Sequence, residues 1–127
     1  RLAGTLWPGP LTLVLGRPGP CPSWFAPGEA AIALRIPGHP VPLALLKTLA
    51  APLAVTSANP TGERECVDPW EVQEVFGDDP DLLLVDGGRA GGAAASTVVD
   101  ARGEEPRILR DGPLPLGLIE EVWHGRE

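Results

Sequence analysis

The chain has 127 residues, 43% of them apolar, and its 10 basic and 17 acidic residues give a net charge of −7. This length predicts a single domain, residues 1–127, with enough apolar side chains for a packed core. The acidic balance argues against direct binding of RNA or DNA, because nucleic-acid-binding proteins usually carry a basic surplus.

The first half of the chain contains two predicted strands and a helix, separated by Gly and Pro. The apolar run Leu11–Leu15 lies between a Trp-Pro-Gly-Pro segment and a glycine, which predicts a buried strand. Residues 16–28 contain four prolines and predict a loop. A second strand is expected over Ala30–Ile36. A helix is expected to begin at Pro40, because leucines then recur at helical spacing and Pro is tolerated in a first turn.

The second half continues with short strands and two further helices. Leu53–Thr56 is expected to be a strand. Asp68 followed by Pro69 is an N-cap signal, so a helix is expected from there to about Phe76. Further strands are expected at residues 82–85, 97–99 and 107–110, and a terminal helix at 116–123. About six strands and three helices in mixed order predict an α/β (or α+β-like) fold, with a twisted mixed sheet and flanking helices.

The sequence also limits location and cofactors. No stretch approaches the roughly 20 apolar residues of a membrane span, and no secretory signal opens the chain. The two unpaired thiols of Cys21 and Cys66 fit a cytoplasmic protein. Cys21 and Cys66 lie far apart without a CxxC motif, and the chain has only two histidines, so no protein-bound metal is expected. The P-loop, GxSxG, HExxH and GxGxxG motifs do not occur in the sequence.

The tripeptide Ser57-Ala58-Asn59 holds the single asparagine of the chain and directly follows the expected strand Leu53–Thr56. Side chains alternate along a strand, so Ser57 and Asn59 would point the same way. They would then suit a small polar ligand at the strand's carboxyl end, where open α/β sheets bind ligands. The alternative is a plain strand-to-turn junction, because Ser and Asn are common in turns.

Two arginines are candidates for binding an anion. Arg35 interrupts an apolar strand, where it would need a carboxylate or phosphate partner. Its alternative is a solvent-facing strand position. Arg110 stands beside an Asp-Gly turn, and its alternative is a surface ion pair with Asp100 or Asp111.

Hydroxyl side chains complete the candidate site. Ser96 follows a glycine-rich stretch, whose backbone N–H groups could approach an oxyanion, and the alternative is a flexible loop. Thr12 lies in the first predicted strand. Together with the arginines and Asn59, these residues predict a site for an anionic small molecule. Such a site would act by positioning and charge stabilisation, as expected for nucleotidyl or phosphoryl transfer.

Five motifs follow one another along nearly the whole chain, from about Leu6 to the terminal helix. They are Trp7-Pro8-Gly9-Pro10-Leu11-Thr12, Arg35-Ile36-Pro37, Ser57-Ala58-Asn59 with Thr61-Gly62, Ser96-Thr97-Val98-Val99-Asp100 and Leu109-Arg110-Asp111-Gly112. In this order they resemble the YrdC-like family. The resemblance implies a YrdC-like twisted α/β fold and a nucleotidyltransferase, an L-threonylcarbamoyladenylate synthase. Its reaction makes threonylcarbamoyl-AMP from L-threonine, bicarbonate and ATP, releases pyrophosphate, and serves the threonylcarbamoyladenosine modification of tRNA through partner proteins downstream.

The resemblance also implies residue roles. Ser57 and Asn59 are the implied catalytic residues in the nucleotide site, and Thr12 and Arg110 also contact ATP. The implied threonine-binding residues are Arg35, Val55 and Ser96. ATP as substrate is expected to bring Mg²⁺, while no metal cage of the protein is expected.

The resemblance covers the C-terminal two-thirds of the family's domain. The chain begins with Arg1 and contains no Met, so it is expected to start inside a longer protein. The family's N-terminal part carries a Lys-x-Arg pair that forms a tetrad with Ser-x-Asn, and this pair is missing here. The chain alone is therefore expected to bind ATP weakly or not at all. The family often has small polar residues near positions 65 to 67, where this chain has Glu65, Cys66 and Val67. Glu65 would repel phosphate if it faced the site.

Other functions fit parts of the same pattern. One is a carbamoyl-adenylating domain of a hydrogenase-maturation protein, which flanking CxxC pairs would mark. Another is a non-catalytic RNA-binding or ribosome-associated YrdC-like module, against which the acidic charge argues. A degenerate, inactive copy is a further alternative.

Overall fold

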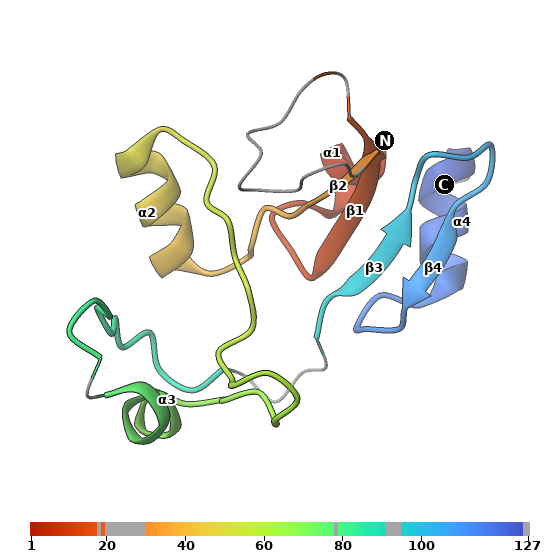
Figure 1. Cartoon of the computed structure of the whole chain (residues 1–127). Coiled ribbons are helices and arrows are strands. Elements are labelled where there is room, and N and C mark those ends of the chain that lie inside the picture. The colour runs from red at the N-terminus through yellow and green to blue at the C-terminus, as the bar shows by residue number, and fades with distance from the viewer. Residues whose placement is uncertain (18, 20–29, 78, 91–94, 126–127) are drawn as a thin grey trace. The chain divides into compact units, whose positions relative to one another are not determined.

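The computed structural model describes residues 1–17, 19, 30–77, 79–90 and 95–125 (Figure 1). The chain forms two compact units. The first, here called the sheet unit, comprises Arg1–Pro52 and Ala94–Glu127, and the second, the loop unit, comprises Leu53–Ala93. The loop predicted over residues 16–28 lies mostly outside the described residues. In the described part of the chain, no helix is long and apolar enough to cross a lipid bilayer.

The sheet unit is built on a four-stranded mixed sheet (Figure 1). Its strands are β1 (Leu11–Gly16), β2 (Ala31–Leu34), β3 (Thr97–Asp100) and β4 (Arg107–Arg110), in the order β2-β1-β3-β4. β1 pairs antiparallel with β2 and parallel with β3, and β4 returns antiparallel to β3. These strands and the mixed α/β fold class confirm the sequence-based predictions.

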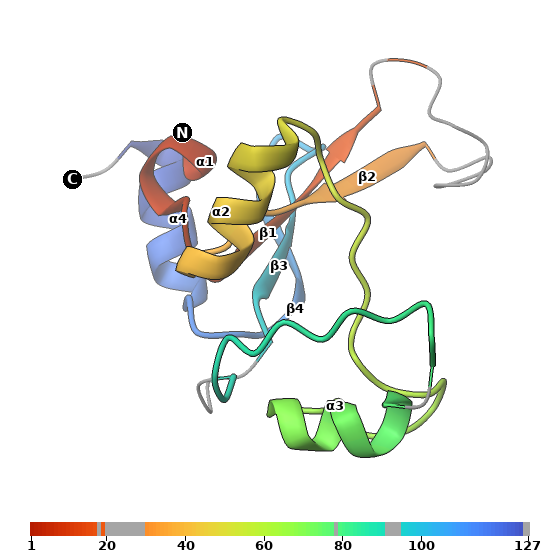
Figure 2. The ribbon, with the colours of Figure 1, turned by 90° about the vertical axis from the view of Figure 1, so that its left-hand side faces the viewer.

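Two helices cover one face of this sheet. Figure 2 shows α1 (Leu2–Leu6) and α4 (Leu116–His124) side by side, and their residues contact each other. The core beneath them consists of the buried residues Leu2, Leu11, Leu13, Val99 and Ile119. Because side chains alternate along a strand, residues between these core positions face the other side of the sheet. The helix α1 was not predicted from the sequence, whereas α4 was.

A third helix of the sheet unit, α2 (Pro40–Leu49), begins where the sequence predicts it. His39 is the N-cap, and its Nδ1 accepts a hydrogen bond from the backbone N–H of Val41 at 3.3 Å. The helix ends at Ala50, whose φ of 50° is left-handed. The chain therefore leaves this helix through a left-handed C-cap, a common way for helices to end.

The loop unit contains α3 (Pro69–Phe76), which confirms the helix predicted there. The Asp68 carboxylate caps it by accepting a hydrogen bond from the backbone N–H of Glu71 at 3.0 Å. Glu71 in turn pairs with Arg64 at 2.7 Å, so the start of the helix is tied to the preceding loop.

Two strands predicted in the loop unit are wrong. Leu53–Thr56 and residues 82–85 have no regular secondary structure over their apolar runs. Val55 is 87% exposed and Leu83 is 85% exposed. Both runs are rich in strand-forming residues, but a strand is stable only when a neighbour completes its ladder of hydrogen bonds, and no such neighbour occurs in the described part of this unit. The described residues consequently contain four strands instead of about six.

Candidate functional site

The sheet unit carries a polar row on the face opposite its core. Thr12 is registered with Val98 across β1 and β3, and Val98 with Arg110 across β3 and β4. Side chains in register on neighbouring strands share a face. Ser96 lies two residues before Val98 and therefore points to this face as well. The parallel pairing of β1 and β3 is what brings the first and the fourth sequence motif together.

Hydrogen bonds join these side chains directly. The hydroxyl oxygens of Thr12 and Ser96 lie 2.7 Å apart, and Ser96 is only 5% exposed. Arg110 donates from Nε and Nη2 to the backbone oxygen of Ser96 at 3.1 and 3.0 Å, and from Nη2 to its Oγ at 3.1 Å. This double attachment fixes the plane of the guanidinium group. Three of the residues predicted for the site, Thr12, Ser96 and Arg110, thus form one network.

Arg35 belongs to the same unit, but its contact differs from the expected one. β2 ends at Leu34, so Arg35 lies just beyond the strand, where its Nε donates to the backbone oxygen of Gly9 at 3.0 Å. Gly9 in turn donates its N–H to the oxygen of Ile36 at 2.9 Å. Sequence reasoning missed Gly9 as a partner, although the glycine of the Trp-Pro-Gly-Pro motif marks a place where another chain segment can approach closely.

The charge of Arg110 acts on Arg35. The pKa of Arg35 lies below its ordinary value, first because the side chain is partly shielded from water and second because of the positive charge of Arg110. Asp100, one proposed partner of Arg110, is instead paired with Arg102 at 2.7 Å. Among the described residues, neither Arg35 nor Arg110 has an acidic partner. Two guanidinium groups without a carboxylate partner are suited to binding an anion.

Two further residues predicted for the site, Ser57 and Asn59, lie in the loop unit. Ser57 is exposed and Asn59 is half-buried, and neither follows a strand. Asn59 donates from Nδ2 to the backbone oxygens of Pro60 and Glu63, both at 3.0 Å. Its Oδ1 is buried and lacks a hydrogen-bond partner among the described residues. The junction is therefore a hydrogen-bonded turn, with one polar acceptor left over.

The remaining candidates in the loop unit contribute less to this geometry. Val55 and Glu65 are exposed. Cys66 is a free thiol, half-buried, and Cys21 lies outside the described residues. Within the described ranges, no group of three or more His, Cys, Asp or Glu side chains is placed to hold a metal ion.

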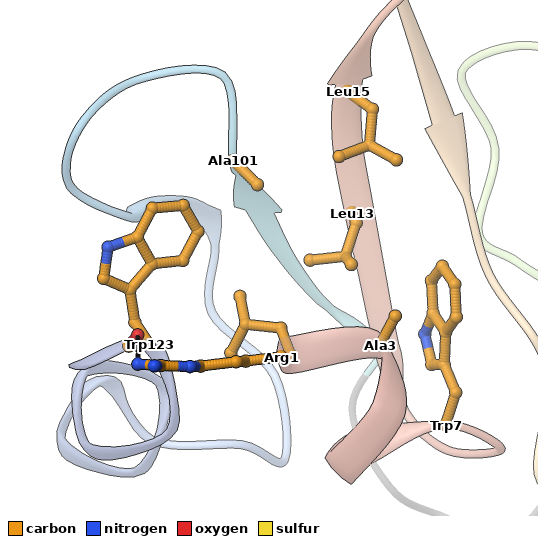
Figure 3. Close-up of a pocket in the computed structure, with 8 residues that line it drawn as sticks. Arg1, Ala3, Trp7, Leu13, Leu15, Ala101 and Trp123 are labelled. Carbon is orange, nitrogen blue, oxygen red and sulfur yellow. Dashed lines mark hydrogen bonds between the residues drawn. The ribbon is translucent and has the colours of Figure 1, made fainter. Parts of the chain in front are cut away.

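A cavity of about 420 Å³ lies on the helix-covered face of the sheet unit (Figure 3). Leu13 and Leu15 line it from β1, and the indole rings of Trp7 and Trp123 lie on either side. The indole N–H of Trp7 donates to the backbone oxygen of Leu11 at 2.8 Å, and that of Trp123 donates to the backbone oxygen of Glu104 at 3.1 Å. Because its lining is mostly apolar, this cavity is not the anion site that the arginines define.

The fold agrees with comparisons to known proteins. The Sua5/YciO/YrdC family, described as "Telomere recombination", matches residues 1–112. The chain belongs to this family. The match extends over both units, and it confirms the resemblance to the YrdC-like family that the motifs indicate.

Three relatives illustrate the similarity. The threonylcarbamoyl-AMP synthase of Pyrococcus abyssi is 37% identical over 121 residues, which are 95% of this chain and 35% of that protein. The crystal structure of P. abyssi Sua5 complexed with L-threonine matches with a TM-score of 0.84 and 38% identity, over 95% of this chain and 35% of that one. The structure of Escherichia coli YciO matches with a TM-score of 0.73 and 28% identity, over 91% of this chain and 56% of that one.

The chain is shorter than its relatives. It spans 35% of the P. abyssi synthase and 55% of a putative threonylcarbamoyl-AMP synthase of Mycobacterium tuberculosis. The names of these longer proteins describe activities of the whole relatives.

Proposed function

We propose that this chain carries part of an L-threonylcarbamoyladenylate synthase, a nucleotidyltransferase that acts in the cytoplasm. The reaction joins L-threonine, bicarbonate and ATP into threonylcarbamoyl-AMP. The amine of threonine first condenses with bicarbonate to a carbamate, and water is released. A carbamate oxygen then bonds to the α-phosphorus of ATP, while the bond from this phosphorus to the oxygen shared with the β-phosphate breaks and pyrophosphate leaves. The product then serves downstream proteins of tRNA modification.

The main support for this proposal is the pair of arginines, Arg35 and Arg110. L-threonine and ATP both carry anionic groups that need to be held, a carboxylate on threonine and phosphates on ATP. Arg35 and Arg110 supply two guanidinium groups without acidic partners among the described residues, and the charge of one lowers the pKa of the other. Bound anions would relieve this repulsion, so the pair favours anionic ligands.

Each site residue has a specific proposed role. Arg35, Val55 and Ser96 bind threonine, with the Arg35 guanidinium on the carboxylate. Thr12, Ser57, Asn59 and Arg110 bind ATP, and Ser57 and Asn59 are the catalytic residues. Since Ser96 and Arg110 are hydrogen-bonded at 3.1 Å, the threonine-binding and ATP-binding sets share a network. Fixed donors of this kind stabilise charge without reorganising during the reaction.

In this proposal Mg²⁺ binds together with ATP and not at a metal site of the protein. The described residues offer no cluster of acidic, His or Cys side chains for a metal ion. Mg²⁺ typically binds through substrate phosphates and few protein ligands. In this proposal it therefore arrives on the triphosphate of ATP, and the protein's own residues act by positioning and by charge.

The comparisons favour the synthase over the alternative functions. Relatives named threonylcarbamoyl-AMP synthase are 37% and 38% identical over nearly the whole chain. A carbamoyl-adenylating domain of a hydrogenase-maturation protein would use the same fold for a different substrate. A non-catalytic RNA-binding module is disfavoured by the net charge of −7.

Mass spectrometry and calorimetry test the proposal together. The chain is incubated with ATP, Mg²⁺, L-threonine and ¹³C-bicarbonate, and the products are searched for labelled threonylcarbamoyl-AMP. Binding of L-threonine is measured in parallel by calorimetry, with D-threonine as control. Labelled product, or binding of L-threonine that Ser96→Ala abolishes, is the expected result. Absence of both product and stereoselective binding would contradict the proposal.

A further inference from the structure

The backbone of Arg35 is held on both sides, although this residue lies just beyond β2. On its N-terminal side, Leu34 is registered with Leu13 of β1. On its C-terminal side, the backbone oxygen of Ile36 accepts a hydrogen bond from the N–H of Gly9 at 2.9 Å. The freedom that remains to Arg35 therefore lies in its side chain, which is long and rich in rotamers.

The backbone oxygen of Gly9 restrains this side chain as well. It accepts a hydrogen bond from Nε of Arg35 at 3.0 Å. A guanidinium group has five N–H donors in a fixed planar fork, one on Nε and two on each Nη. Among the described residues, Nη1 and Nη2 of Arg35 have no hydrogen-bond partner. The edge formed by these two nitrogens is left for a ligand, and such an edge can bind a carboxylate through two parallel hydrogen bonds.

Arg110 uses its guanidinium group differently. Its Nε and Nη2 both donate to the backbone oxygen of Ser96, and Nη2 also donates to the Ser96 hydroxyl. In the described part of the chain, Nη1 is thus the nitrogen of Arg110 that makes no hydrogen bond. Arg35 presents two nitrogens to a ligand where Arg110 presents one, so Arg35 is the better suited of the two to a planar carboxylate.

The position of Gly9 requires a glycine because of space. Gly9 is buried, and a Cβ built on it would lie 2.5 Å from the backbone oxygen of Leu6 at the end of α1. Gly38 also lies against it, since a Cβ built at Gly38 would be 3.4 Å from the Cα of Gly9. Close backbone approaches of this kind are a typical use of glycine. They leave the Gly9 peptide little room to move, which fixes the acceptor for Arg35.

We propose that Gly9 is a positioning residue, whose backbone oxygen and missing side chain orient the Arg35 guanidinium so that its Nη1–Nη2 edge receives the carboxylate of L-threonine. The identity of this ligand rests on the proposed function. Gly9 touches no substrate in this proposal and acts through Arg35.

The first test needs no ligand. The exchange of arginine Hε hydrogens with water is followed by ¹⁵N NMR, and each signal is identified by its loss in an Arg→Lys variant. We expect Hε of Arg35 to exchange at least about tenfold more slowly than that of the exposed Arg107, because only the former is hydrogen-bonded. Gly9→Ala is expected to remove this difference. Hε of Arg110, bonded to Ser96, is expected to stay protected in the variant and reports that the sheet is intact.

Two results of this test would overturn the proposal. One is equal exchange of Arg35 and Arg107 in wild type. The other is unchanged protection of Arg35 in Gly9→Ala. A variant that also loses the protection of Arg110 has lost its fold, and the decision then passes to a titration of wild type. L-Threonine is expected to shift the Nη signals of Arg35 and to leave its Hε protected, whereas loss of this protection on binding would contradict the proposal.

The second test is a double-mutant cycle with two ligands, measured by calorimetry. Gly9→Ala is expected to weaken L-threonine binding roughly 2- to 10-fold, the range of one hydrogen bond, and to leave ATP binding unchanged. In the Arg35→Lys background, Gly9→Ala is expected to cause no further loss, because a residue that acts through Arg35 adds nothing once the guanidinium is gone. Additive losses, or equal losses for both ligands, would assign Gly9 a merely structural role.

Gly16→Ala is the matched control for the substitution. Gly16 ends β1, and a Cβ there would meet nothing within 4 Å. This variant is expected to match wild type in exchange and in both affinities. If wild type bound no L-threonine, the proposed function would fail, and the role of Gly9 toward that ligand with it. The exchange measurement would still decide whether Gly9 orients Arg35, so the two failures are distinguishable.

Discussion

The hydroxyl oxygens of Thr12 and Ser96 lie 2.7 Å apart, although 84 positions separate the two residues in the chain. The parallel pairing of β1 with β3 brings them together. Arg110 also donates to the Ser96 hydroxyl at 3.1 Å. Thr12 and Arg110, which are proposed to bind ATP, are therefore both hydrogen-bonded to the hydroxyl of Ser96, which is proposed to bind threonine. A change at any of the three is expected to affect the others, because hydrogen bonds in a network are not independent.

The first prediction concerns the hydroxyl of Thr12. Thr12→Val keeps the shape of the side chain but removes the bond to Ser96. We expect the affinity for L-threonine to fall roughly 2- to 10-fold, since one neutral hydrogen bond is lost next to the binding hydroxyl. Thr12→Ser keeps the hydroxyl and is expected to bind like wild type. Calorimetric titration measures both, and equal affinities of Thr12→Val and wild type would show that the Thr12 hydroxyl does not matter for threonine.

The second prediction separates the two arginines. Arg35→Ala is expected to weaken L-threonine binding more than ATP binding, and Arg110→Ala the reverse, because each guanidinium holds a different anion. Loss of a charge-assisted hydrogen bond corresponds to roughly 10- to 100-fold in affinity. Arg107→Ala, at the start of β4 and exposed, is the matched control for a lost positive charge. Equal effects of both variants on both ligands would rule out this division of roles.

Local signals explain which elements could be predicted from the sequence. The helix α3 begins with Asp68 and Pro69, an N-cap and a first-turn proline that act within one turn, and its prediction is confirmed. The helix α1 has only five residues and no side-chain cap, so nothing local indicates it. The predicted strand Leu53–Thr56 has the right residues, but strand formation depends on a distant neighbour, which the local sequence does not contain.

The candidate site could be predicted by residue type but not by contact. An arginine beside apolar strand residues indicates anion binding in the sequence, and Arg35 and Arg110 fit this pattern. Their actual partners, the backbone oxygens of Gly9 and Ser96, depend on strand register and on the end of β2. Likewise, the sequence singles out Asn59, but only the structure shows that its amide hydrogens are used within the turn.

The third prediction concerns the close packing of Gly112 against β3. A Cβ at this position would overlap the backbone nitrogen of Thr97 and come within 2.6 Å of the oxygen of Ala95. Backbone atoms cannot move aside as a flexible side chain does, so Gly112→Ala is expected to lower the free energy of unfolding by roughly 1–3 kcal/mol or more. The measurement is urea unfolding followed by circular dichroism.

Gly117 provides the matched control for this substitution. It lies in α4, and a Cβ there would meet nothing within 4 Å. Gly117→Ala is expected to raise the free energy of unfolding by roughly 0.5–1 kcal/mol, because Ala favours a helix over Gly. Equal stability of the two variants would show that Gly112 has more space than the structure indicates.

The fourth prediction concerns the acid stability of the turn after β3. The carboxylate of Asp100 accepts hydrogen bonds from Nε and Nη2 of Arg102 at 2.8 and 2.7 Å, and from its backbone N–H at 3.1 Å. These contacts lower the pKa of Asp100 from 3.8 to about 2, first through the side-chain bond and then through the backbone bond. A pKa that is lower in the folded state means that the stabilisation is complete above the unfolded value and is lost as the pH falls through the folded value.

We therefore expect the stability difference between wild type and Asp100→Asn to shrink as the pH falls from about 4 towards 2, because the variant cannot gain a proton there. Urea unfolding at several pH values in this range measures the difference. Arg102→Gln removes the partner while leaving Asp100 in place, so it should flatten the same pH dependence. A difference that stays constant from pH 4 to pH 2 would mean that the Asp100–Arg102 pair does not persist in solution.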